Sequence, residues 1–580
     1  MSQYICNPLN LEYRYQIKKS RKGDSVFREA ADPTVLLFRG TYYMFASMSG
    51  GFWYSNDLCN WTHKETPELP IYDYAPDVRE IDGRIIFSAS RRNAPCSFWS
   101  TEDPLKNPFT PVAATFEFWD PNIFQDDNGR VFFYWGCSNR EPIYGIEVDP
   151  KTFQPLTEKV ALINENEMEH GWERKGENAI LEPPKTEIDK MIRQYTGTKP
   201  HIEGAYMTKH DGKYYLQYAA PGTEYNLYGD GVYLSEHPLG PFEYQEHNPF
   251  SSKPGGFIAA AGHGSTFQDK FGNWWHMSTM RISANENFER RIGLFPCSFD
   301  DDGILYCNQN FADYPFKIPE GPFSGISKTV PDLQLISYNK KATASSNQKG
   351  YGSELGVNED VRSWWAAERA GDQEWYQLDL GKTYKIQAAQ INFADHKIPF
   401  PKCNEDEMHK ESFGYRKIEI QPKGTEYLLE GSLDGMEWFP LKNTIGLDMD
   451  LAHDFISFDN PPVLRYIRLS HMKMPFNNVP AISGLRVFGK GNGKMPDAIR
   501  KVNVSRESRQ NILLKWDHSF GADGYNVRYG IAPGKLYNSW QLYGACELDL
   551  CIANTESSYY IAVDSFNENG VTVGKIFFVK

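Results

Sequence analysis

The sequence predicts an all-β protein in which a five-bladed β-propeller is followed by two β-sandwich domains. Five stretches between residues 30 and 280 share one template, in which a polar head residue precedes a strand, a turn glycine and a second strand. Runs of Val, Ile, Phe, Tyr and Trp dominate the chain, whereas helical periodicity is weak. The pattern changes after a Pro/Gly-rich junction at 317–335, where the repeats end.

The repeated heads stand six to nine residues before their turn glycines. Glycine supplies the positive φ of a tight turn, so each unit is predicted to be a β-hairpin. A single hairpin cannot bury both of its faces, and recurrence at roughly fifty residues is typical of propeller blades. An isolated Asp-Pro is usually a turn or a helix cap, but five heads in phase favour one shared central cavity. The heads are Asp32, Asp77, Asp120, Glu203 and His263.

The spacing between consecutive heads is uneven, at 45, 43, 83 and 60 residues. The long third interval predicts an insertion after the third blade. The polar stretch 164–195 is the candidate, and we expect it to shape the rim of the central pocket.

Three domains follow from these patterns: the propeller at 1–320 and two sandwiches at 335–489 and 495–580. The first sandwich alternates like paired strands from Ala344 to about Gly489, and a Gly/Lys-rich linker precedes the second. Because the second spans less than a hundred residues, it is the smaller unit.

Composition excludes several classes of protein. The 580 residues carry a net charge of −14 and a pI near 5.5, which argues against a nucleic-acid partner. We expect no transmembrane segment, because no apolar run reaches the ~20 residues that one needs. Residues 1–15 lack an apolar signal core. The protein is therefore expected to be cytoplasmic, or secreted, periplasmic or at the cell surface if a signal peptide has been removed.

Nine cysteines without a Cys-x-x-Cys motif argue against a disulfide framework. Cys546 and Cys551 are the one pair close enough in sequence to suggest a bond. Oligomeric state does not follow from the sequence.

The heads stand in the contexts Ala31-Asp32-Pro33, Ala75-Pro76-Asp77, Trp119-Asp120-Pro121, Glu203-Gly204 and Gly262-His263-Gly264-Ser265. In this order they resemble glycoside hydrolase family 43 over residues 25–315. The resemblance implies a five-bladed propeller that hydrolyses glycosidic bonds with inversion. It implies Asp32 as general base, Glu203 as general acid, and Asp120 as the neighbour that modulates and holds the acid.

The same resemblance implies that His263 faces the channel and holds a water molecule or, through water, a calcium ion. No cofactor is otherwise expected. Asp77 is implied to be structural or to contact sugar. From the residues themselves, Arg291 or its neighbour Arg290 is a candidate to bind a sugar hydroxyl or the acids. Trp53 is either a packing residue of its blade or a sugar platform.

One position departs from the family pattern, which usually has Glu-Gly-Pro at the acid. Here the sequence is Glu203-Gly204-Ala205. We expect the carboxyl to stay in place and only the local turn to change.

Inverting hydrolysis needs a protonated carboxyl on one side of the scissile bond and a carboxylate on the other, roughly 6.5–9.5 Å apart. Blades one and four lie across a five-fold ring, which suits that separation. A neighbouring anion favours the protonated form of an acid, and Asp120 is placed to supply one.

The predicted activity is exo-acting removal of terminal sugars from plant-type polysaccharide, with α-L-arabinofuranosyl preferred. A β-xylosidase or an exo-β-galactosidase or galactofuranosidase is the alternative within the family. A rival of another class is a non-catalytic carbohydrate-binding or adhesion protein. Residues 335–489 resemble a discoidin or coagulation-factor C-type module and 495–580 a fibronectin type III domain, which bind sugar or act as spacers.

Overall fold

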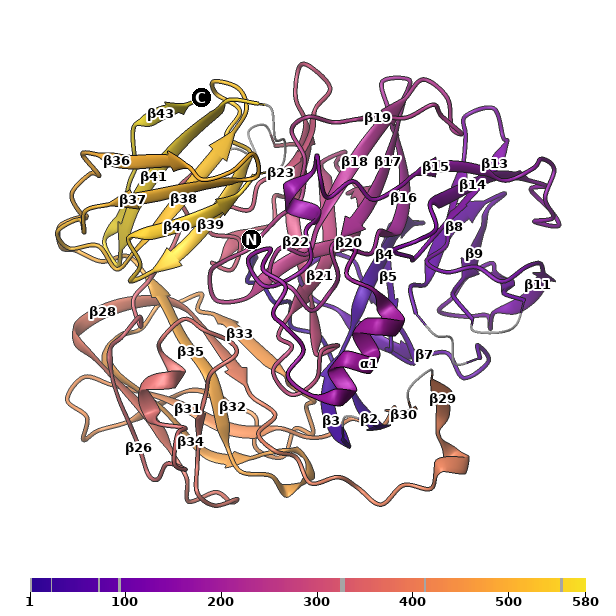
Figure 1. Cartoon of the computed structure of the whole chain (residues 1–580). Coiled ribbons are helices and arrows are strands. Elements are labelled where there is room, and N and C mark those ends of the chain that lie inside the picture. The colour runs from indigo at the N-terminus through magenta and orange to yellow at the C-terminus, as the bar shows by residue number, and fades with distance from the viewer. Residues whose placement is uncertain are drawn as a thin grey trace.

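The computed structural model describes residues 3–21, 23–70, 74–91, 95–323, 329–411, 414–552 and 557–580. Part of the predicted junction, at 324–328, lies outside them. Figure 1 shows a propeller, a second domain in orange and a third domain in yellow. Strands dominate throughout, and the one α-helix within the described ranges is α1 (Glu187–Thr196). This helix is too short to cross a membrane, and no helix in those ranges is long and apolar enough to do so.

The first part of the chain is a five-bladed β-propeller, as predicted, and each blade has four strands. Blade one comprises β4 (Ala31–Phe38), β5 (Thr41–Ser47), β6 (Gly51–Ser55) and β7 (Thr62–Glu65). Blade two comprises β8 (Asp77–Ile81), β9 (Arg84–Ser88), β10 (Ser97–Thr101) and β11 (Thr110–Ala114). Blade three comprises β12 (Asn122–Gln125), β13 (Val131–Trp135), β14 (Ile143–Val148) and β15 (Val160–Ile163). Blade four comprises β16 (Glu203–His210), β17 (Lys213–Ala220), β18 (Gly229–Ser235) and β19 (Glu243–Tyr244). Blade five comprises β20 (Ala259–Gln268), β21 (Trp274–Arg281), β22 (Arg290–Phe299) and β23 (Leu305–Cys307).

The first strand of each blade lies innermost, and these five strands form a closed ring. Strands β4, β8, β12, β16 and β20 contact one another in this order, and β20 contacts β4. Hydrogen bonds link the last blade to the first; among them, Asp32 N donates to Thr279 Oγ1 at 2.8 Å, and Val35 N donates to Ser265 Oγ at 3.1 Å. The heads of the first four blades therefore lie at or within two residues of the start of an inner strand, and His263 lies within β20, all around one axis.

The strands near the axis of each blade are largely buried on both faces because each blade packs between two neighbours, whereas the outermost strands, such as β7, are partly exposed. In β5, six of seven residues are buried. Such strands read as continuous apolar runs rather than as alternating ones. This explains why Tyr42–Ala46 contains no charged residue.

Asp77 ties three blades together. Its carboxylate accepts hydrogen bonds from Ile123 N at 2.6 Å and Asn122 Nδ2 at 3.1 Å in blade three, and from Thr34 Oγ1 at 3.4 Å in blade one. The side chain is 1% exposed. Asp77 is thus a structural latch at the start of β8.

The second domain is a sandwich built on one long strand, β28 (Tyr376–Phe393). This strand belongs to both sheets, because its register breaks between Asp379 and Tyr384. Its pairing partners are β26 (Lys341–Ala344), β33 (His453–Ser457), β34 (Val463–Lys473) and β35 (Ala481–Gly489). The remaining strands are β25 (Gln334–Leu335), β27 (Trp365–Ala366), β31 (Glu426–Ser432) and β32 (Phe439–Asn443).

The third domain is a sandwich of a three-stranded and a five-stranded sheet. The first holds β36 (Val502–Arg506), β37 (Asn511–Trp516) and β40 (Glu547–Cys551), and the second β38 (Gly524–Gly530), β39 (Asn538–Tyr543), β41 (Tyr559–Asn567), β42 (Gly570–Thr572) and β43 (Ile576–Val579). Trp516 and Trp540 pack in its core. Both Cys546 and Cys551 are free thiols, so the suggested disulfide is wrong.

A hairpin of the second domain departs from the predicted domain division. Strands β29 (His409–Glu411) and β30 (Gly414–Glu419) do not join either sandwich sheet. Instead β30 pairs with β2 (Arg14–Ser20), which pairs with β3 (Ser25–Glu29). Without β30, β2 would leave an unpaired edge, and pairing satisfies its backbone groups.

The insertion 164–195 braces the propeller against the third domain. Trp172 Nε1 donates to the Tyr244 hydroxyl of blade four at 2.9 Å, and Arg174 Nη2 donates to Asn511 Oδ1 of the third domain at 2.9 Å. The helix α1 follows, with Thr186 and Asp189 forming its N-terminal capping box.

A buried polar network joins all three domains. Arg486 of the second domain binds Glu359 Oε2 at 2.9 Å and donates to Asp313 O at 2.6 Å. Tyr543 of the third domain donates to Glu359 at 3.3 Å. Lys253 of the propeller pairs with Asp313 Oδ2 at 2.8 Å. These contacts fix the domains to one another.

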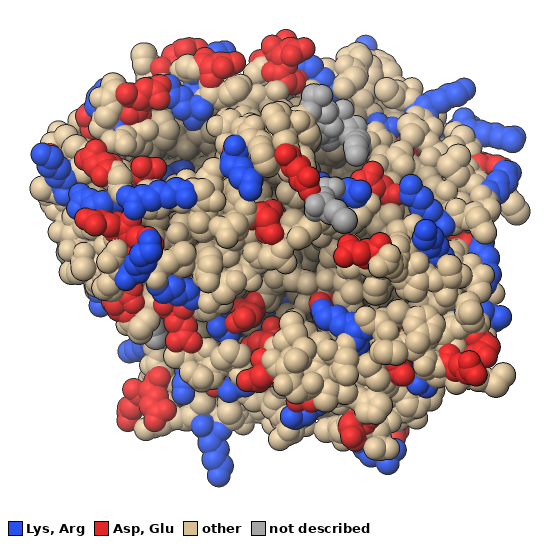
Figure 2. Space-filling view, turned by 180° about the vertical axis from the view of Figure 1, so that it is seen from behind, with Lys and Arg blue, Asp and Glu red and all other residues tan. Residues whose placement is uncertain are grey.

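Charges of both signs are intermingled on the face shown in Figure 2. Among the described residues of that face, lysines and arginines form no continuous area. The expectation of no nucleic-acid partner stays a prediction.

We expect Asp77→Ala to lower the free energy of unfolding by about 3 kcal/mol, because it leaves the buried Ile123 N–H without an acceptor. Glu80→Ala, on the same strand but exposed, is the matched control and should change it by less than about 0.5 kcal/mol. Urea unfolding of both variants measures the difference. Equal stabilities would show that Asp77 is no latch.

Candidate active site

Local backbone bulges aim the head side chains into the central channel. Asp32, Asp120 and His263 have positive φ angles of 53°, 50° and 49°. The strand register breaks at the same places, between Ala31 and Thr34 in β4 and between Gly262 and Ser265 in β20. A bulge redirects a side chain, and positive φ is costly for residues other than glycine, which is typical of functional positions.

Four of the five heads meet in one cluster. His263 Nδ1 lies 3.4 Å from Asp32 Oδ1 and 3.8 Å from Asp120 Oδ2. Carboxylate oxygens of Asp120 and Glu203 lie within 4.8 Å of each other. Asp32 and Asp120 are buried, whereas Glu203 is half-buried. The cluster is therefore reached from the Glu203 side.

Asp32 is held by two donors. Ser47 Oγ donates to its Oδ2 at 2.7 Å, and Arg290 Nη1 donates to its Oδ1 at 3.2 Å. Arg290 is fixed in turn by Glu29, at 2.6 Å from Nη2. A charge-assisted donor and a hydroxyl stabilise negative charge on Asp32.

The second domain also contacts the residues that hold Asp32, through the ring of Tyr74. The ring of Tyr74 lies between two guanidinium groups, at 5.5 Å from Arg290 and 5.3 Å from Arg416. Arg416 comes from β30 and is 1% exposed in its side chain. The hairpin that joins the N-terminal sheet thus packs against the ring that contacts Arg290.

Glu203 is held by two residues that the sequence did not indicate. The Tyr228 hydroxyl donates to Oε1 at 2.6 Å, and the Cys137 thiol donates to Oε2 at 3.2 Å. Neither stands in a repeated head position, so the template gave no signal for them. Each precedes or follows a blade strand by one or two residues.

The pKa of Asp120 is raised from 3.8 to about 7, and burial is the largest cause. The negative charges of Glu203 and Asp32 also raise this pKa, while His263 and the Gly204 N–H lower it. The cluster therefore retains a proton at a pH at which ordinary carboxyls have lost theirs. General acid catalysis needs such a proton.

Burial alone would lower the pKa of His263, but the carboxyl groups around it, Asp32 first, outweigh burial and raise it. Asp230 fixes the bulge that presents this ring. It accepts from His263 N at 2.7 Å and binds His276 Nε2 at 2.7 Å. His276 is thus a support of the site.

Two predicted substrate contacts, Trp53 and Arg291, do not reach the channel in this structure, and Asp77 has the structural one of its two expected roles. Trp53 lies within β6 and is fully buried in the hydrophobic core, where its ring packs edge-on against His63. Arg291 points away from the channel and donates to His453 Nε2 at 2.8 Å, because neighbouring residues of a strand face opposite sides. Arg290, the alternative, is the one that reaches the carboxyls. Asp77 is the latch described above.

The surroundings of His263 do not fit a directly bound calcium ion. Calcium takes six to eight oxygen ligands, whereas the imidazole faces two carboxyl groups, those of Asp32 and Asp120. The water-mediated ion stays a prediction, and no step depends on it.

Gly204 is required by the geometry beside the acid. Its φ is +65°, and a Cβ there would lie 2.7 Å from the His263 ring. Its N–H also bonds the Asp120 carboxyl. The Gly-Ala sequence keeps this backbone, with Ala205 buried.

A five-bladed propeller with this carboxyl cluster at its axis defines a glycoside hydrolase domain. Residues 26–305 match the model of the family described as Glycosyl hydrolases family 43. This part of the chain, which contains all five inner strands, belongs to that family.

Curated relatives match part of the chain. It is 25% identical over 292 residues to a xylan 1,3-β-xylosidase from a Vibrio species, covering 44% of this chain and 49% of that protein. It is 24% identical over 157 residues to a β-xylosidase from Xylanibacter ruminicola, covering 25% and 44%. The chain spans about half the length of the curated relatives it matches, or less. A solved glycoside hydrolase has a TM-score of 0.43 at 17% identity, covering 79% of this chain and 97% of that one.

Gly204→Ala should lower kcat/KM at least a hundredfold, because the new methyl group displaces the His263 ring or the acid. Gly212→Ala, at the turn of the same hairpin, is the matched control: φ is +80°, but its Cβ meets nothing within 4 Å. Both variants should lose about 1 kcal/mol of stability to backbone strain. If both keep full activity, the contact with His263 has no role.

Asp120 should make stability fall with rising pH. Its folded pKa lies above the unfolded value of 3.8, so its contribution is complete below about pH 4 and is lost as pH rises through about 7. Asp120→Asn should remove no more than about 4 kcal/mol of this pH dependence. Urea unfolding of both forms at pH 4 to 8 measures it, and parallel profiles would contradict it.

Proposed function

We propose that the protein is an inverting, exo-acting glycoside hydrolase that removes terminal pentosyl units from plant-type polysaccharide or its oligosaccharides. One observation carries the proposal: carboxyl groups from blades one, three and four meet in one half-open cluster. Asp32 is held by a cation, and Asp120 shares its buried site with Glu203.

Each carboxyl has a distinct task in this mechanism. Asp32 takes a proton from a water molecule, whose oxygen attacks the anomeric carbon. Glu203 gives its proton to the glycosidic oxygen as the bond to that carbon breaks. Asp120 and the donors Tyr228 and Cys137 hold the acid in place.

Two terminal sugars compete as substrate. The sequence favoured α-L-arabinofuranosyl, whereas the curated relatives are named β-xylosidases. Their names support β-xylosyl as the first substrate to test and α-L-arabinofuranosyl as the second. Galactosyl and galactofuranosyl units complete the panel.

The rival binding protein would need no acid–base pair. Asp32 and Glu203 come from two blades that are not neighbours in the ring, and each is held by two hydrogen-bond donors. Such preorganisation of charged groups suits catalysis and is of no use to a lectin.

The test compares wild type with Glu203→Gln on 4-nitrophenyl and methyl glycosides of the four sugars. Glu203→Gln should lower kcat by a factor of roughly 10³ or more on methyl glycosides and by less on 4-nitrophenyl glycosides, whose leaving group needs less protonation. Glu243→Gln, an exposed acid of the same blade, is the control. NMR of the first-formed sugar should show the anomer opposite to that of the substrate.

Turnover of one glycoside by wild type and its loss in Glu203→Gln would support the enzyme and identify the sugar. Binding of polysaccharide without turnover of any substrate would instead support the lectin. Retention of the substrate's anomeric configuration would leave a hydrolase but reject inversion.

A further inference from the structure

The last hairpin of the propeller carries two cysteines that face each other. Strands β22 and β23 pair antiparallel, and Cys297 stands directly opposite Cys307. Both side chains are fully buried, and both are free thiols in this structure. The hydrolytic mechanism uses neither of them.

The backbone hydrogen bonds define the geometry of this pair. Cys307 N donates to Phe250 O at 2.8 Å, so this N–H points away from β22. One residue further along, Asn308 N donates to Pro296 O of β22 at 2.9 Å. Cys297 and Cys307 are therefore a non-hydrogen-bonded pair, whose Cα atoms lie about 4.5 Å apart. Disulfides join Cα atoms that are roughly 4.4–6.8 Å apart, so a bond fits this backbone.

Both thiols are protected once the chain has folded. Burial raises the pKa of Cys307 well above its ordinary value of 9.0, and a hydrogen bond with the Cys297 side chain raises it too. The charge of Asp230 acts in the same direction, whereas Ser251 lowers the pKa. Because the thiolate is the form that attacks a disulfide, the folded pair is unreactive. Oxidation would have to occur while the chain folds.

Cys546 and Cys551 lack this geometry. Cys551 ends β40, and Cys546 directly precedes the first residue of the same strand. An extended chain rises about 3.3 Å per residue, which separates the two by roughly 16 Å. Strand pairing, and not closeness in sequence, therefore decides which cysteines can bond.

The hairpin that carries Cys297 and Cys307 also contacts the third domain. The ring of Tyr306 stacks on that of Tyr537, with centroids 4.0 Å apart. Asp300, in the turn of the hairpin, accepts from the Tyr537 hydroxyl at 2.7 Å and pairs with Lys535 at 2.8 Å. Strand β23 is the outermost of its blade and has three residues. A bond to β22 would hold this short strand, and with it the contact surface, in place.

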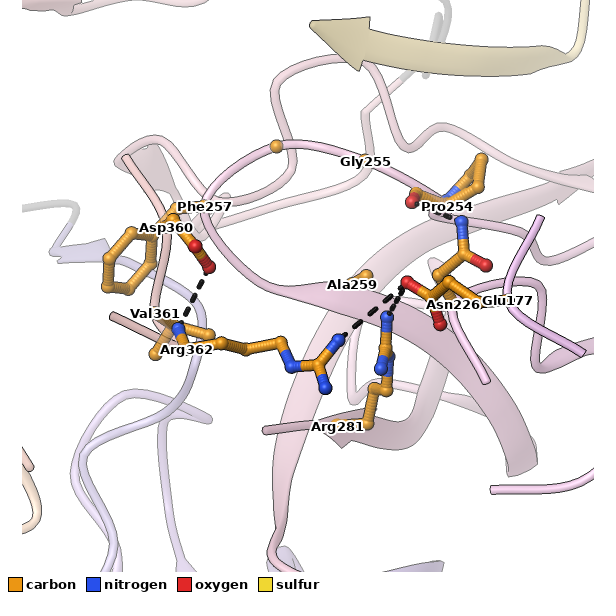
Figure 3. A pocket seen from close by; sticks show the side chains of 11 residues that line it. Glu177, Asn226, Pro254, Gly255, Phe257, Ala259, Arg281, Asp360, Val361 and Arg362 are labelled. Atoms are coloured by element: carbon orange, nitrogen blue, oxygen red, sulfur yellow. Dashed lines mark hydrogen bonds and ion pairs between the residues drawn. The ribbon is translucent and has the colours of Figure 1, made fainter. Parts of the chain in front are cut away.

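The same blade contacts the second domain. Figure 3 shows the second-domain loop 360–362 beside Ala259 and Arg281 of blade five. Val361 N donates to Phe257 O, two residues before β20, at 3.1 Å. Blade five thus lies between both later domains, so a bond within it would stabilise the assembled chain.

We propose that Cys297 and Cys307 are a cross-linking site, at which a disulfide forms when the chain folds in an oxidising compartment and ties β23 to β22. The oxidant is a small disulfide such as oxidised glutathione. One cysteine thiolate attacks it and releases one glutathione thiolate, and the second cysteine attacks the mixed disulfide and releases the other. Two protein thiols and one glutathione disulfide thereby give one protein disulfide and two glutathione thiols.

This site would record where the protein folded. In a reducing compartment the chain folds with both thiols, which is the form of this structure. Burial then prevents exchange in either direction. The state of the pair would therefore distinguish protein folded in the cytoplasm from protein folded after export.

The test synthesises the full chain in a cell-free system in two glutathione buffers, one reducing and one oxidising. Soluble protein is unfolded, alkylated, digested with chymotrypsin and analysed by mass spectrometry. The oxidising buffer should leave seven of the nine cysteines alkylated and join the peptides of Cys297 and Cys307, whereas the reducing buffer should leave all nine alkylated. Folded, reduced protein that is moved to the oxidising buffer should keep all nine.

Two variants serve as controls. Cys307→Ala should give no linked peptide in either buffer, and Cys546→Ala should form the link as the wild type does. Absence of the link in soluble wild type, or equal yields of other pairings, would overturn the proposal. Absence of soluble protein from the oxidising buffer would overturn it too, because the proposed bond fits the native backbone.

Thermal unfolding measures what the bond does to the blade. Wild type from the oxidising buffer should have a midpoint about 5 °C higher than wild type from the reducing buffer. Cys307→Ala from the two buffers should have one midpoint. Equal midpoints for the two wild-type preparations would contradict a bond that holds β23 in place.

Discussion

The contact of β20 with β4 is the constraint on which the rest of the structure depends. It closes the ring of inner strands, and it brings His263 of the last blade to Asp32 of the first. Those residues are 231 positions apart in sequence, so only closure makes them neighbours. The bulges then orient the side chains, because a regular strand would point them to the sheet faces, which pack against neighbouring blades, and not toward the axis. Asp230 fixes the bulge at His263 by accepting a hydrogen bond from its backbone N–H. Asp77 links its own blade to blade three by accepting from Ile123 N.

Much of this architecture could be predicted because its signal repeats. A head, a turn glycine and two strands recur five times, and repetition fixes both the number of blades and the common position of the heads. Asp32, Asp120, Glu203 and His263 consequently meet where the template places them. Asp77 has the same head position, yet its side chain bonds the backbone of blade three. Its role depends on Ile123 and Asn122, which no pattern around Asp77 reveals.

Two kinds of feature could not be predicted: the side of a strand to which a side chain points, and contacts between residues that are far apart in sequence. Arg290 and Arg291 are adjacent, and only the phase of β22 decides which one reaches Asp32. Trp53 resembles a sugar platform in sequence, but its strand lies between blades, where both faces are buried. Cys137 and Tyr228 touch the acid from non-repeated positions. The pairing of β30 with β2 joins residues about 400 apart, and no local propensity encodes such a contact.

The buried network around Arg486 bears on how this chain can be divided. The family match ends at residue 305, but Asp313 and its partners Lys253 and Arg486 lie on both sides of that limit. Cutting there would leave Lys253 buried without its counter-ion, and removal of one partner of a buried pair is costly. The catalytic propeller is therefore not an exchangeable module. A shortened chain that keeps the propeller would have to keep Asp313 and Arg486 as well, and with Arg486 the second domain.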